Sequence, residues 1–172
     1  MITLIANSAG RFKQAQNGSS RDYKCAIGRS GMVAAALKRE GDGASPVGMW
    51  PLRRVFYRAD RLARPGTGLS CLPIGTDQGW CDDPEHAAYN QLVTLPFSAS
   101  HEVMWREDGV YDVVVELGHN DDPPVPGLGS AIFLHVARPD YSPTEGCIAL
   151  ALEDFLCVLQ TCDSNSVLEI CT

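Results

Sequence analysis

The amino-acid sequence predicts a mostly β fold with one or two packed α-helices, and three observations favour this class. Most apolar runs are short, rich in β-branched or aromatic residues, and bounded by Gly, Pro, Asn or Asp, as is typical of strands. Only one long segment has a convincing helical periodicity. The 172 residues contain no repeat and no linker, so we expect a single domain over residues 1–172 with one sizeable core.

The strand candidates are distributed along the whole chain. Residues 113–115 are Val-Val-Val and are apolar on both faces, which predicts a central strand, and residues 131–136 have the same character. The candidates are residues 3–6, 23–28, 55–57, 110–117, 131–136 and 167–171. Residues 60–107 are rich in loops, and loops of that length usually form the walls of functional sites.

The convincing helix lies at residues 150–160, where the apolar side chains fall on one face. These side chains are Leu152, Phe155, Leu156 and Leu159. A second, weaker helix is predicted at residues 32–39, because Gly41 follows it as a terminator.

The composition excludes several classes of protein. With 21 acidic and 14 basic residues the net charge is −7, whereas a nucleic-acid-binding protein needs a basic surface. We interpret the arginines at residues 53–64 as a solvated face rather than an anion site. No apolar run approaches the ~20 residues of a membrane span. The first residues lack the features of a signal peptide, so either the chain is cytoplasmic or an export signal has been removed.

The seven cysteines do not follow a metal-binding pattern. No C-x-x-C pair occurs, and no two Cys/His pairs have the spacing of zinc ligands, so we expect no metal site. An odd number leaves at least one cysteine unpaired in a monomer. Cys71 and Cys81 flank a run of turns and are candidates for a disulfide in an oxidising compartment.

A possible nucleophile stands in the segment Pro143-Thr-Glu-Gly-Cys147-Ile, twelve residues after His135. Gly146 allows a tight turn and a close approach of substrate to Cys147. Because the convincing helix follows, we expect the thiol at a loop–helix junction, where helix-terminal N–H groups favour the thiolate and serve as an oxyanion hole. His135 ends the preceding strand and supplies a base, which completes the minimum for acyl transfer.

A second motif makes this interpretation more specific. Gly41-Asp-Gly-Ala-Ser-Pro-Val-Gly48, followed by Met-Trp-Pro-Leu, joins His135 and Glu-Gly-Cys147 in a pattern that resembles the L,D-transpeptidase (YkuD-type) catalytic domain. That family has an early Gly-x-x-[Ser/Thr]-Pro-x-Gly turn, then a strand ending in His, then a [Ser/Thr]-His-Gly-Cys segment. The resemblance runs from about Tyr23 to the C-terminal residue, and it implies a β-sandwich or barrel-like catalytic domain.

The resemblance implies roles for individual residues. Cys147 is similar to the nucleophile and His135 to its base, while the carbonyl of Val136 is in the place that orients the imidazole. Gly146 and Cys147 are expected to offer N–H groups to the oxyanion. Thr144 matches the family's Ser/Thr and is expected to contact substrate.

Two positions depart from the family pattern. Glu145 replaces a His, and Ala149 replaces an Arg or Asn. A carboxylate near the thiol raises its pKa unless it points away or pairs with Arg138. The loss of the polar residue at 149 removes a substrate contact. We interpret these changes as signs of a divergent subfamily in which Glu145 faces an altered substrate.

Other candidate substrate contacts each have a plainer alternative. Arg138 and Tyr141 lie between base and nucleophile, so Arg138 either holds a substrate carboxylate or pairs with Glu145 or Asp140. Trp80 and Asp82 either bind an ammonium group or hold a turn. His101 and Glu102 look like an acid–base pair, but a surface histidine is the favoured interpretation.

The implied substrate is the stem peptide of peptidoglycan. The enzyme would form a thioester at an L–D amide and transfer the acyl group to an amine of a neighbouring stem. It would need no metal or organic cofactor, act in the periplasm or cell envelope, and work as a monomer. Two alternatives stay open, namely hydrolysis of the thioester by an L,D-carboxypeptidase or endopeptidase, and a non-catalytic cell-wall-binding module.

Overall fold

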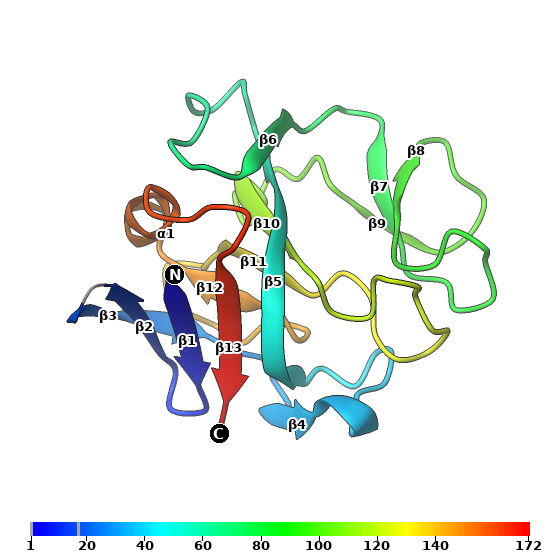
Figure 1. Ribbon diagram of the computed structural model, residues 1–172. Coiled ribbons are helices and arrows are strands. Elements are labelled where there is room, and N and C mark those ends of the chain that lie inside the picture. The colour runs from blue at the N-terminus through cyan, green and yellow to red at the C-terminus, as the bar shows by residue number, and fades with distance from the viewer. Residues whose placement is uncertain (1, 17) are drawn as a thin grey trace.

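The structure is a computed structural model that describes residues 2–16 and 18–172. Its main feature is a large sheet that closes on itself (Figure 1). The strands of this sheet are β1 (Thr3–Asn7), β2 (Arg11–Gln16), β3 (Ser19–Ala26), β4 (Met32–Ala34), β5 (Ser45–Tyr57), β6 (Ser70–Pro73), β10 (Val113–Leu117), β11 (Phe133–Val136), β12 (Ile148–Leu150) and β13 (Val167–Cys171).

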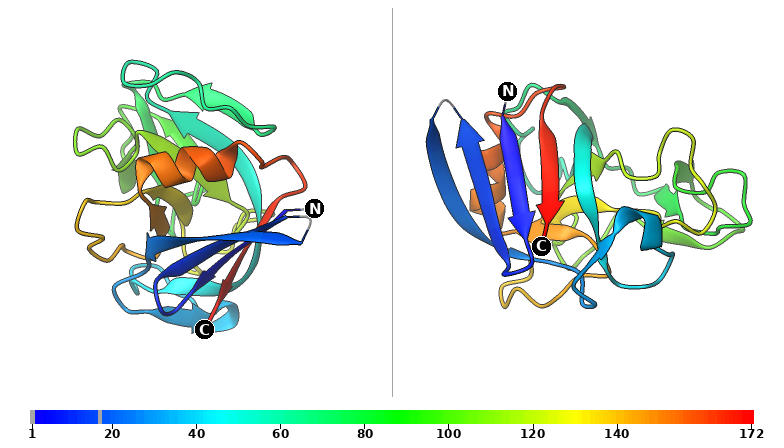
Figure 2. Two further views of the ribbon diagram at one scale, coloured as in Figure 1. Left: turned by 90° about the vertical axis from the view of Figure 1, so that its left-hand side faces the viewer. Right: turned by 60° about the horizontal axis from the view of Figure 1, so that its bottom comes forward.

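Strand order explains the closure. The sheet runs β10-β11-β12-β3-β2-β1-β13-β5-β4, and β10 also pairs with β5, which joins the two ends into a barrel. The first and last strands are parallel neighbours, with Thr3 beside Val167. Figure 2 shows β3, β2, β1, β13 and β5 side by side in this order. The predicted mostly β, barrel-like class is confirmed.

A smaller antiparallel sheet, β8-β7-β9, lies beside the barrel (Figure 1). It comprises β7 (Gln78–Cys81), β8 (Leu92–Thr94) and β9 (His101–Val103). These strands fall within residues 60–107, which the sequence presents as loops. Each is only three or four residues long, which is too short to show the apolar alternation by which a strand is recognised.

The α-helix of the described residues is α1 (Leu152–Leu159), and Figure 2 shows it lying across the barrel strands. Its buried side chains, Phe155, Val158 and Leu159, join the main core. The predicted second helix at residues 32–39 is wrong. Residues 32–34 form β4, which pairs with β5, and Ala35–Leu37 form a single 3-10 turn. Tertiary pairing outweighs the weak helical preference of the alanines there.

Two apolar cores lie on opposite faces of β10 and β11. Val113 and Val115 point into the barrel core with α1, whereas Val114 points into a second core under the smaller sheet. In the same way, Leu134 faces the barrel and Phe133 faces the second core. This double burial confirms the central-strand prediction, and it places alternate residues of β11 where the site forms.

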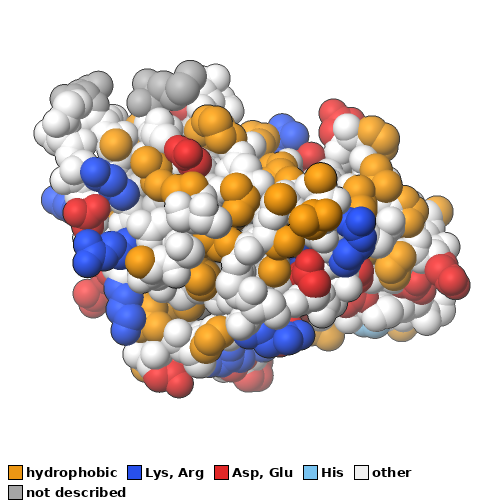
Figure 3. Space-filling model, turned by 90° about the horizontal axis from the view of Figure 1, so that it is seen from below, with side chains coloured by type: hydrophobic (Ala, Val, Ile, Leu, Met, Phe, Trp, Pro, Cys, Tyr) orange, Lys and Arg blue, Asp and Glu red, His pale blue; other side chains and the backbone are white. Residues whose placement is uncertain are grey.

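Four of the five arginines at residues 53–64 form ion pairs. Arg53, Arg54 and Arg61 pair with Asp121, Glu116 and Asp112. Arg58 is buried, pairs with Asp60 and lies over the ring of Trp105, so the prediction of a solvated arginine face is wrong at this position. Figure 3 shows basic, acidic and apolar side chains interspersed on one face.

The structure also bears on the expected Cys71–Cys81 disulfide and on membrane-spanning segments. Cys71 and Cys81 are both free thiols, and Cys71 instead faces the carbonyls of Pro65 and Leu69, so the suggested disulfide is wrong. Across the described residues, helices fall short of the length and apolar character that crossing a bilayer requires.

Candidate active site

Cys147 immediately precedes β12 and is 8% exposed. Its thiol donates to the carbonyl of Ala131 at 3.2 Å, and its Sγ accepts the N–H of Phe133 at 3.4 Å. The expected loop–helix junction is wrong, because β12 separates Cys147 from α1, which begins at Leu152. Helix-terminal N–H groups therefore do not reach this thiol.

His135 lies on β11, beside the strand that Cys147 leads into. Its Nδ1 is 2.9 Å from the carbonyl oxygen of Val136. In the tautomer that this bond requires, Nδ1 carries the hydrogen and Nε2 keeps a free lone pair. The ring of Tyr111 meets the imidazole edge-on, with 5.5 Å between centroids. The geometry leaves one nitrogen of His135 available as a base.

Two cavities meet at Cys147. The smaller, of about 110 Å³, is lined by both His135 and Cys147, together with Glu102, Arg106, Val110, Tyr111, Arg138, Thr144 and Glu145. The larger, of about 250 Å³, is lined by Cys147, Lys38, Glu40, Gly41, Asp82, Glu102, Ser130, Ala131, Ile132 and Glu145. Cys147 therefore lines both cavities, and Glu102 and Glu145 also belong to both walls.

Burial dominates the electrostatics of the pair. It raises the pKa of the Cys147 thiol to about 12, with the Glu102 charge adding to the effect and the Phe133 N–H opposing it. Burial also lowers the pKa of His135 to about 4, despite the bond to Val136. The resting site therefore holds a neutral thiol and a neutral imidazole, and the expectation of a favoured thiolate is wrong.

The Gly41–Gly48 motif supports the loop that carries Cys147. Asp42 accepts the N–H groups of Arg39 and Ala44, each at 2.8 Å, and so closes the turn. Ser45 Oγ accepts the buried N–H of Gly28 at 3.0 Å. A Cβ at Gly146 would lie only 2.8 Å from the carbonyl oxygen of Ala44. The two motifs recognised in the sequence are thus in direct contact.

Thr144 holds the turn together from within. Its Oγ1 donates to the carbonyl of Cys147 at 2.6 Å and accepts the N–H of Gly146 at 3.1 Å. The N–H of Gly146 is thus engaged inside the loop, and the expectation that it is presented to an oxyanion is wrong for this state. Thr144 lines the smaller cavity, but both of its contacts here are structural.

The two departures from the family pattern have different surroundings. Glu145 is 76% exposed at its side chain and pairs with Arg29 at 2.8 Å, so the alternative pairing with Arg138 is wrong. Ala149 is buried in β12 between His135 on β11 and Ala26 on β3. A long polar side chain at 149 would have to leave this tightly packed sheet.

Arg138 and Tyr141, which lie between His135 and Cys147 in the sequence, have different surroundings in the structure. Arg138 lines the smaller cavity, and its pairing with Asp108 at 3.3 Å replaces the expected pairing with Glu145 or Asp140. Tyr141 is not among the residues that line either cavity at Cys147. Instead the ammonium group of Lys24 lies 4.3 Å from its ring centroid. Tyr141 therefore braces β3 rather than facing the thiol.

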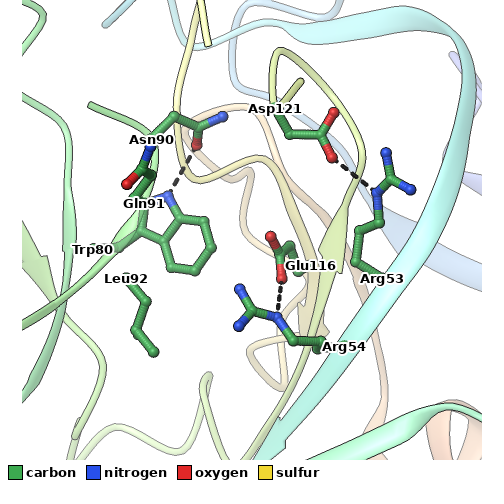
Figure 4. A pocket seen from close by; sticks show the side chains of 8 residues that line it. All are labelled: Arg53, Arg54, Trp80, Asn90, Gln91, Leu92, Glu116 and Asp121. Carbon is green, nitrogen blue, oxygen red and sulfur yellow. Dashed lines mark hydrogen bonds and ion pairs between the residues drawn. The ribbon is translucent and has the colours of Figure 1, made fainter. Parts of the chain in front are cut away.

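Trp80 and Asp82 also have different surroundings, and only Asp82 lines a cavity at Cys147. Trp80 is 2% exposed and packs edge-on against Phe133, and its indole N–H donates to Asn90 (Figure 4). Trp80 is therefore not among the residues that line either cavity at Cys147. Asp82 does line the larger cavity, and its Oδ1 is buried without a hydrogen-bond partner in the described part of the chain.

Tyr111 is a site residue that sequence reasoning missed, and Glu102 was considered there only as a partner of His101. Glu102 lines both cavities, Tyr111 lines the smaller one, and burial raises the pKa of the Glu102 carboxyl. His101 points the other way and bonds to the carbonyl of Ala99, so the two are not an acid–base pair. The alternation of a strand was the signal available, since it sends adjacent residues to opposite faces.

A third cavity, of about 710 Å³, lies on the other side of Trp80. Figure 4 shows it between the smaller sheet and the barrel, with Arg53 facing Asp121 and Arg54 facing Glu116. Cys147 and His135 do not line it. It therefore belongs to a different part of the surface from the two cavities at the thiol.

Solved structures with similar folds include three bacterial proteins. Pgp2, the helical cell shape determining protein from Campylobacter jejuni, is 18% identical over 98% of this chain, with a TM-score of 0.46. L,D-transpeptidase 1 from Mycobacterium tuberculosis is 14% identical over 99%, with a TM-score of 0.43. An L,D-transpeptidase from Mycobacterium smegmatis is 13% identical over 98%, with a TM-score of 0.45.

This chain covers 46%, 62% and 58% of the lengths of those three proteins, respectively. No curated protein matches the sequence. The family model of the L,D-transpeptidase catalytic domain (YkuD) matches residues 3–170, which is nearly all of the chain. The chain therefore belongs to the YkuD family of L,D-transpeptidase catalytic domains.

Proposed function

We propose that this protein is a peptidoglycan L,D-transpeptidase in which Cys147 is the nucleophile and His135 the general base. The observation that carries the proposal is the shared cavity of about 110 Å³, whose wall contains both side chains. The bond from His135 to the Val136 carbonyl supports it, because it leaves Nε2 to accept a proton. Residues 1–172 would act as one catalytic domain.

The reaction begins from the neutral pair. As Sγ attacks the carbonyl carbon of an L–D amide, Nε2 of His135 takes the thiol proton. The tetrahedral intermediate collapses when the C–N bond breaks, and the imidazolium gives that proton to the leaving amine. This leaves a thioester on Cys147. An amine of a neighbouring stem then attacks the thioester, gives up a proton through His135, and the thiol re-forms as the cross-link is made.

The charged residues around the smaller cavity support a peptide substrate with a free carboxylate. Arg138 and Arg106 both line it, and each shares Asp108 as a partner. A guanidinium that keeps unused N–H groups can take a second carboxylate. We assign Arg138 to this role in substrate binding. Thr144 and Glu145 complete the same wall, Thr144 by shaping the loop and Glu145 by its charge.

The cell wall is where members of this family act, so we place the protein in the cell envelope, with peptidoglycan stem peptides as its partners and a monomer as its working form. The chemistry needs only a thiol, an imidazole and N–H donors. The Cys147 N–H is the donor that we assign to the oxyanion, because the Gly146 N–H is engaged by Thr144.

The test is intact-mass spectrometry of the wild type and Cys147→Ala after incubation with disaccharide-peptide monomers, with the products analysed in parallel. We expect an acyl adduct on the wild type and new dimers in the mixture, and neither with Cys147→Ala. Cys157→Ala, which removes an exposed cysteine on α1, is the matched control and should behave as the wild type.

Other outcomes separate the alternatives. Shortened monomers without dimers would show a carboxypeptidase, in which water takes the place of the acceptor amine. Dimers formed equally by Cys147→Ala would contradict the assignment of the nucleophile. Binding of monomers without adduct or product, across several stem lengths, would point to a non-catalytic cell-wall-binding module.

A further inference from the structure

The peptide backbone at Ala131 is strained next to the thiol. Ala131 has a φ of 50°, in the left-handed region that residues other than glycine rarely adopt. Its carbonyl oxygen accepts the Cys147 thiol at 3.2 Å, and its N–H donates to the side-chain oxygen of Asn90 at 3.0 Å. Strain of this kind persists only where surrounding contacts fix it. Here the contact on the N–H side is Asn90.

The side chain of Asn90, which contacts Ala131, is itself buried and fixed by hydrogen bonds. It is 8% exposed, and its Oδ1 also accepts the indole N–H of Trp80 at 2.9 Å (Figure 4). Its Nδ2 donates to the carbonyls of His119 at 3.2 Å and Asn120 at 2.8 Å. All the hydrogen-bonding positions of the amide are thereby used, in a buried place where loss of any one is costly.

We propose that Asn90 is a positioning residue for the Cys147 thiol and acts through the peptide groups of Ala131. Bonds to the N–H and carbonyl on either side of the Ala131 Cα fix both of its backbone torsions. They therefore fix where the carbonyl oxygen stands against Sγ. This inference rests on the proposed function, because the position of the thiol matters for acyl transfer only if Cys147 is the nucleophile.

The contact has two effects on the thiol. As an acceptor, the Ala131 carbonyl favours the protonated form and sets the resting direction of the S–H bond. The charged or titratable groups that line the two cavities at this thiol are Lys38, Glu40, Asp82, Glu102, Arg106, Tyr111, His135, Arg138 and Glu145. None of these groups contacts the Asn90 side chain through a hydrogen bond found among the described residues. A substitution at Asn90 therefore changes the carbonyl contact without changing the local charges.

The test uses Asn90→Gly, with Asn120→Gly as the matched control. Asn90 has a φ of 56° and Asn120 a φ of 52°, so glycine fits both backbones without added strain. The Asn120 side chain bonds to Val125 and Gly129 in the same loop but not to Ala131. The control therefore loosens the loop while leaving the Asn90–Ala131 bond in place.

Two rates are measured, each at the level of the Cys147 peptide after digestion. In Asn90→Gly we expect alkylation by iodoacetamide near pH 8.5 to become about 10-fold faster, because the thiol loses an acceptor that kept it protonated. We expect acylation by disaccharide-peptide monomers to become about 10-fold slower, because the nucleophile is no longer aimed. Cys81, which accepts a backbone bond from Asn90, should remain slow to alkylate and so report that the fold is intact.

The opposite movement of the two rates is the signature of positioning. Equal changes in Asn90→Gly and Asn120→Gly would overturn the proposal, since loop anchoring alone would explain them. If Asn90→Gly does not fold, Asn90→Ser takes its place with Asn120→Ser as its control, because a serine side chain is too short to replace the Asn90–Ala131 bond and adds no charge. The two rates should again move in opposite directions in Asn90→Ser, and equal changes in Asn90→Ser and Asn120→Ser would overturn the proposal. A wild type that alkylates at Cys147 but never acylates would refute the proposed function instead.

Discussion

At the level of single residues, burial acts on the two members of the site in opposite directions. It raises the pKa of Cys147 to about 12 and lowers the pKa of His135 to about 4. Both groups are thus uncharged near neutral pH, in contrast to the thiolate–imidazolium pairs of strongly activated cysteines. In the proposed mechanism, the thiolate nucleophile therefore forms only as His135 takes the thiol proton during attack. The resting thiol is consequently protected from adventitious oxidation.

The low pKa of His135 predicts an acid-sensitive fold. Its ordinary pKa is 6.5, so as the pH falls below 6.5 the unfolded chain binds a proton that the folded protein resists until about pH 4. Stability is therefore lost across this window, by about 3 kcal/mol from this group. We expect His135→Gln to lose less stability than wild type between about pH 7.5 and pH 4 in urea unfolding.

Comparison with each protein's own value near pH 7.5 removes the cost of the substitution itself. Parallel losses in the two proteins over this range would show that His135 titrates normally in the folded state.

At the level of elements, the turn at Gly146, which leads into Cys147, packs against the glycine-rich turn that precedes β5. Gly146 has a φ of 132°, and its Cα faces the carbonyl of Ala44 in the turn that opens β5. The same turn holds Gly28 next to β3, where a Cβ would come within 2.5 Å of the Gly43 carbonyl oxygen. The Gly41–Gly48 motif therefore supports the loop that carries Cys147.

Gly146→Ala tests this arrangement. A Cβ at 2.8 Å from a backbone oxygen must displace the turn, so we expect a loss of about 2 kcal/mol of stability and at least a 10-fold loss of Cys147 acylation. Gly127→Ala is the matched control, because Gly127 also has a positive φ but nothing lies within 4 Å of its added Cβ. Thermal unfolding and adduct formation measure the two effects, and equal costs in the two variants would exclude the contact with Ala44 as the cause.

The elements that the sequence predicted are those whose side chains carry their own signal. β1, β10, β11 and β13 combine β-branched residues with burial, and α1 has a clear apolar face. β2 is Arg-Phe-Lys-Gln-Ala-Gln, with only Phe12 fully buried, so its pairing with β1 is specified by the barrel and not by its own residues. β12 is three residues long, and overlooking it placed Cys147 at a helix instead of a strand.

The residues of the candidate site likewise fall into those that the sequence predicts and those that it does not. Cys147, His135 and the Gly41–Gly48 turn were predictable because they form motifs with fixed spacing. Glu102 comes from the short strand β9, which meets the thiol only through the packing of the smaller sheet on the barrel. Asn90 is likewise joined to Ala131 across long-range contacts. Contacts between segments far apart in the sequence produce no local periodicity, so these two site residues could not be predicted from the sequence.

At the level of the whole molecule, buried thiols are a common element of both cores. Cys25 and Cys162 lie in the barrel core and Cys147 in the second core, and burial raises the pKa of each to about 12. A cysteine whose pKa is raised in the folded protein stabilises the fold below its ordinary pKa of 9. That contribution is lost as the pH rises from 9 towards 12.

We therefore expect alkaline conditions to destabilise the protein, with each buried thiol adding up to about 1.4 kcal/mol per pH unit above about pH 9. Cys162→Ala should flatten this dependence, as measured by urea unfolding from about pH 8.5 to pH 10.5. Cys157→Ala, on the exposed side of the same helix, is the comparison. The same slope in Cys162→Ala and wild type would show that this thiol ionises freely in the native state.

The position of β13 between β1 and β5 has a consequence for biosynthesis. Residues 167–171 pair with both strands, so the barrel stays open until they have left the ribosome. Until then β1 and β5 both present an unpaired edge, with only β2 covering the other side of β1. The nascent chain is accordingly at greatest risk of mispairing just before residues 167–171 emerge. Chaperones that shield exposed strand edges would matter most in that interval.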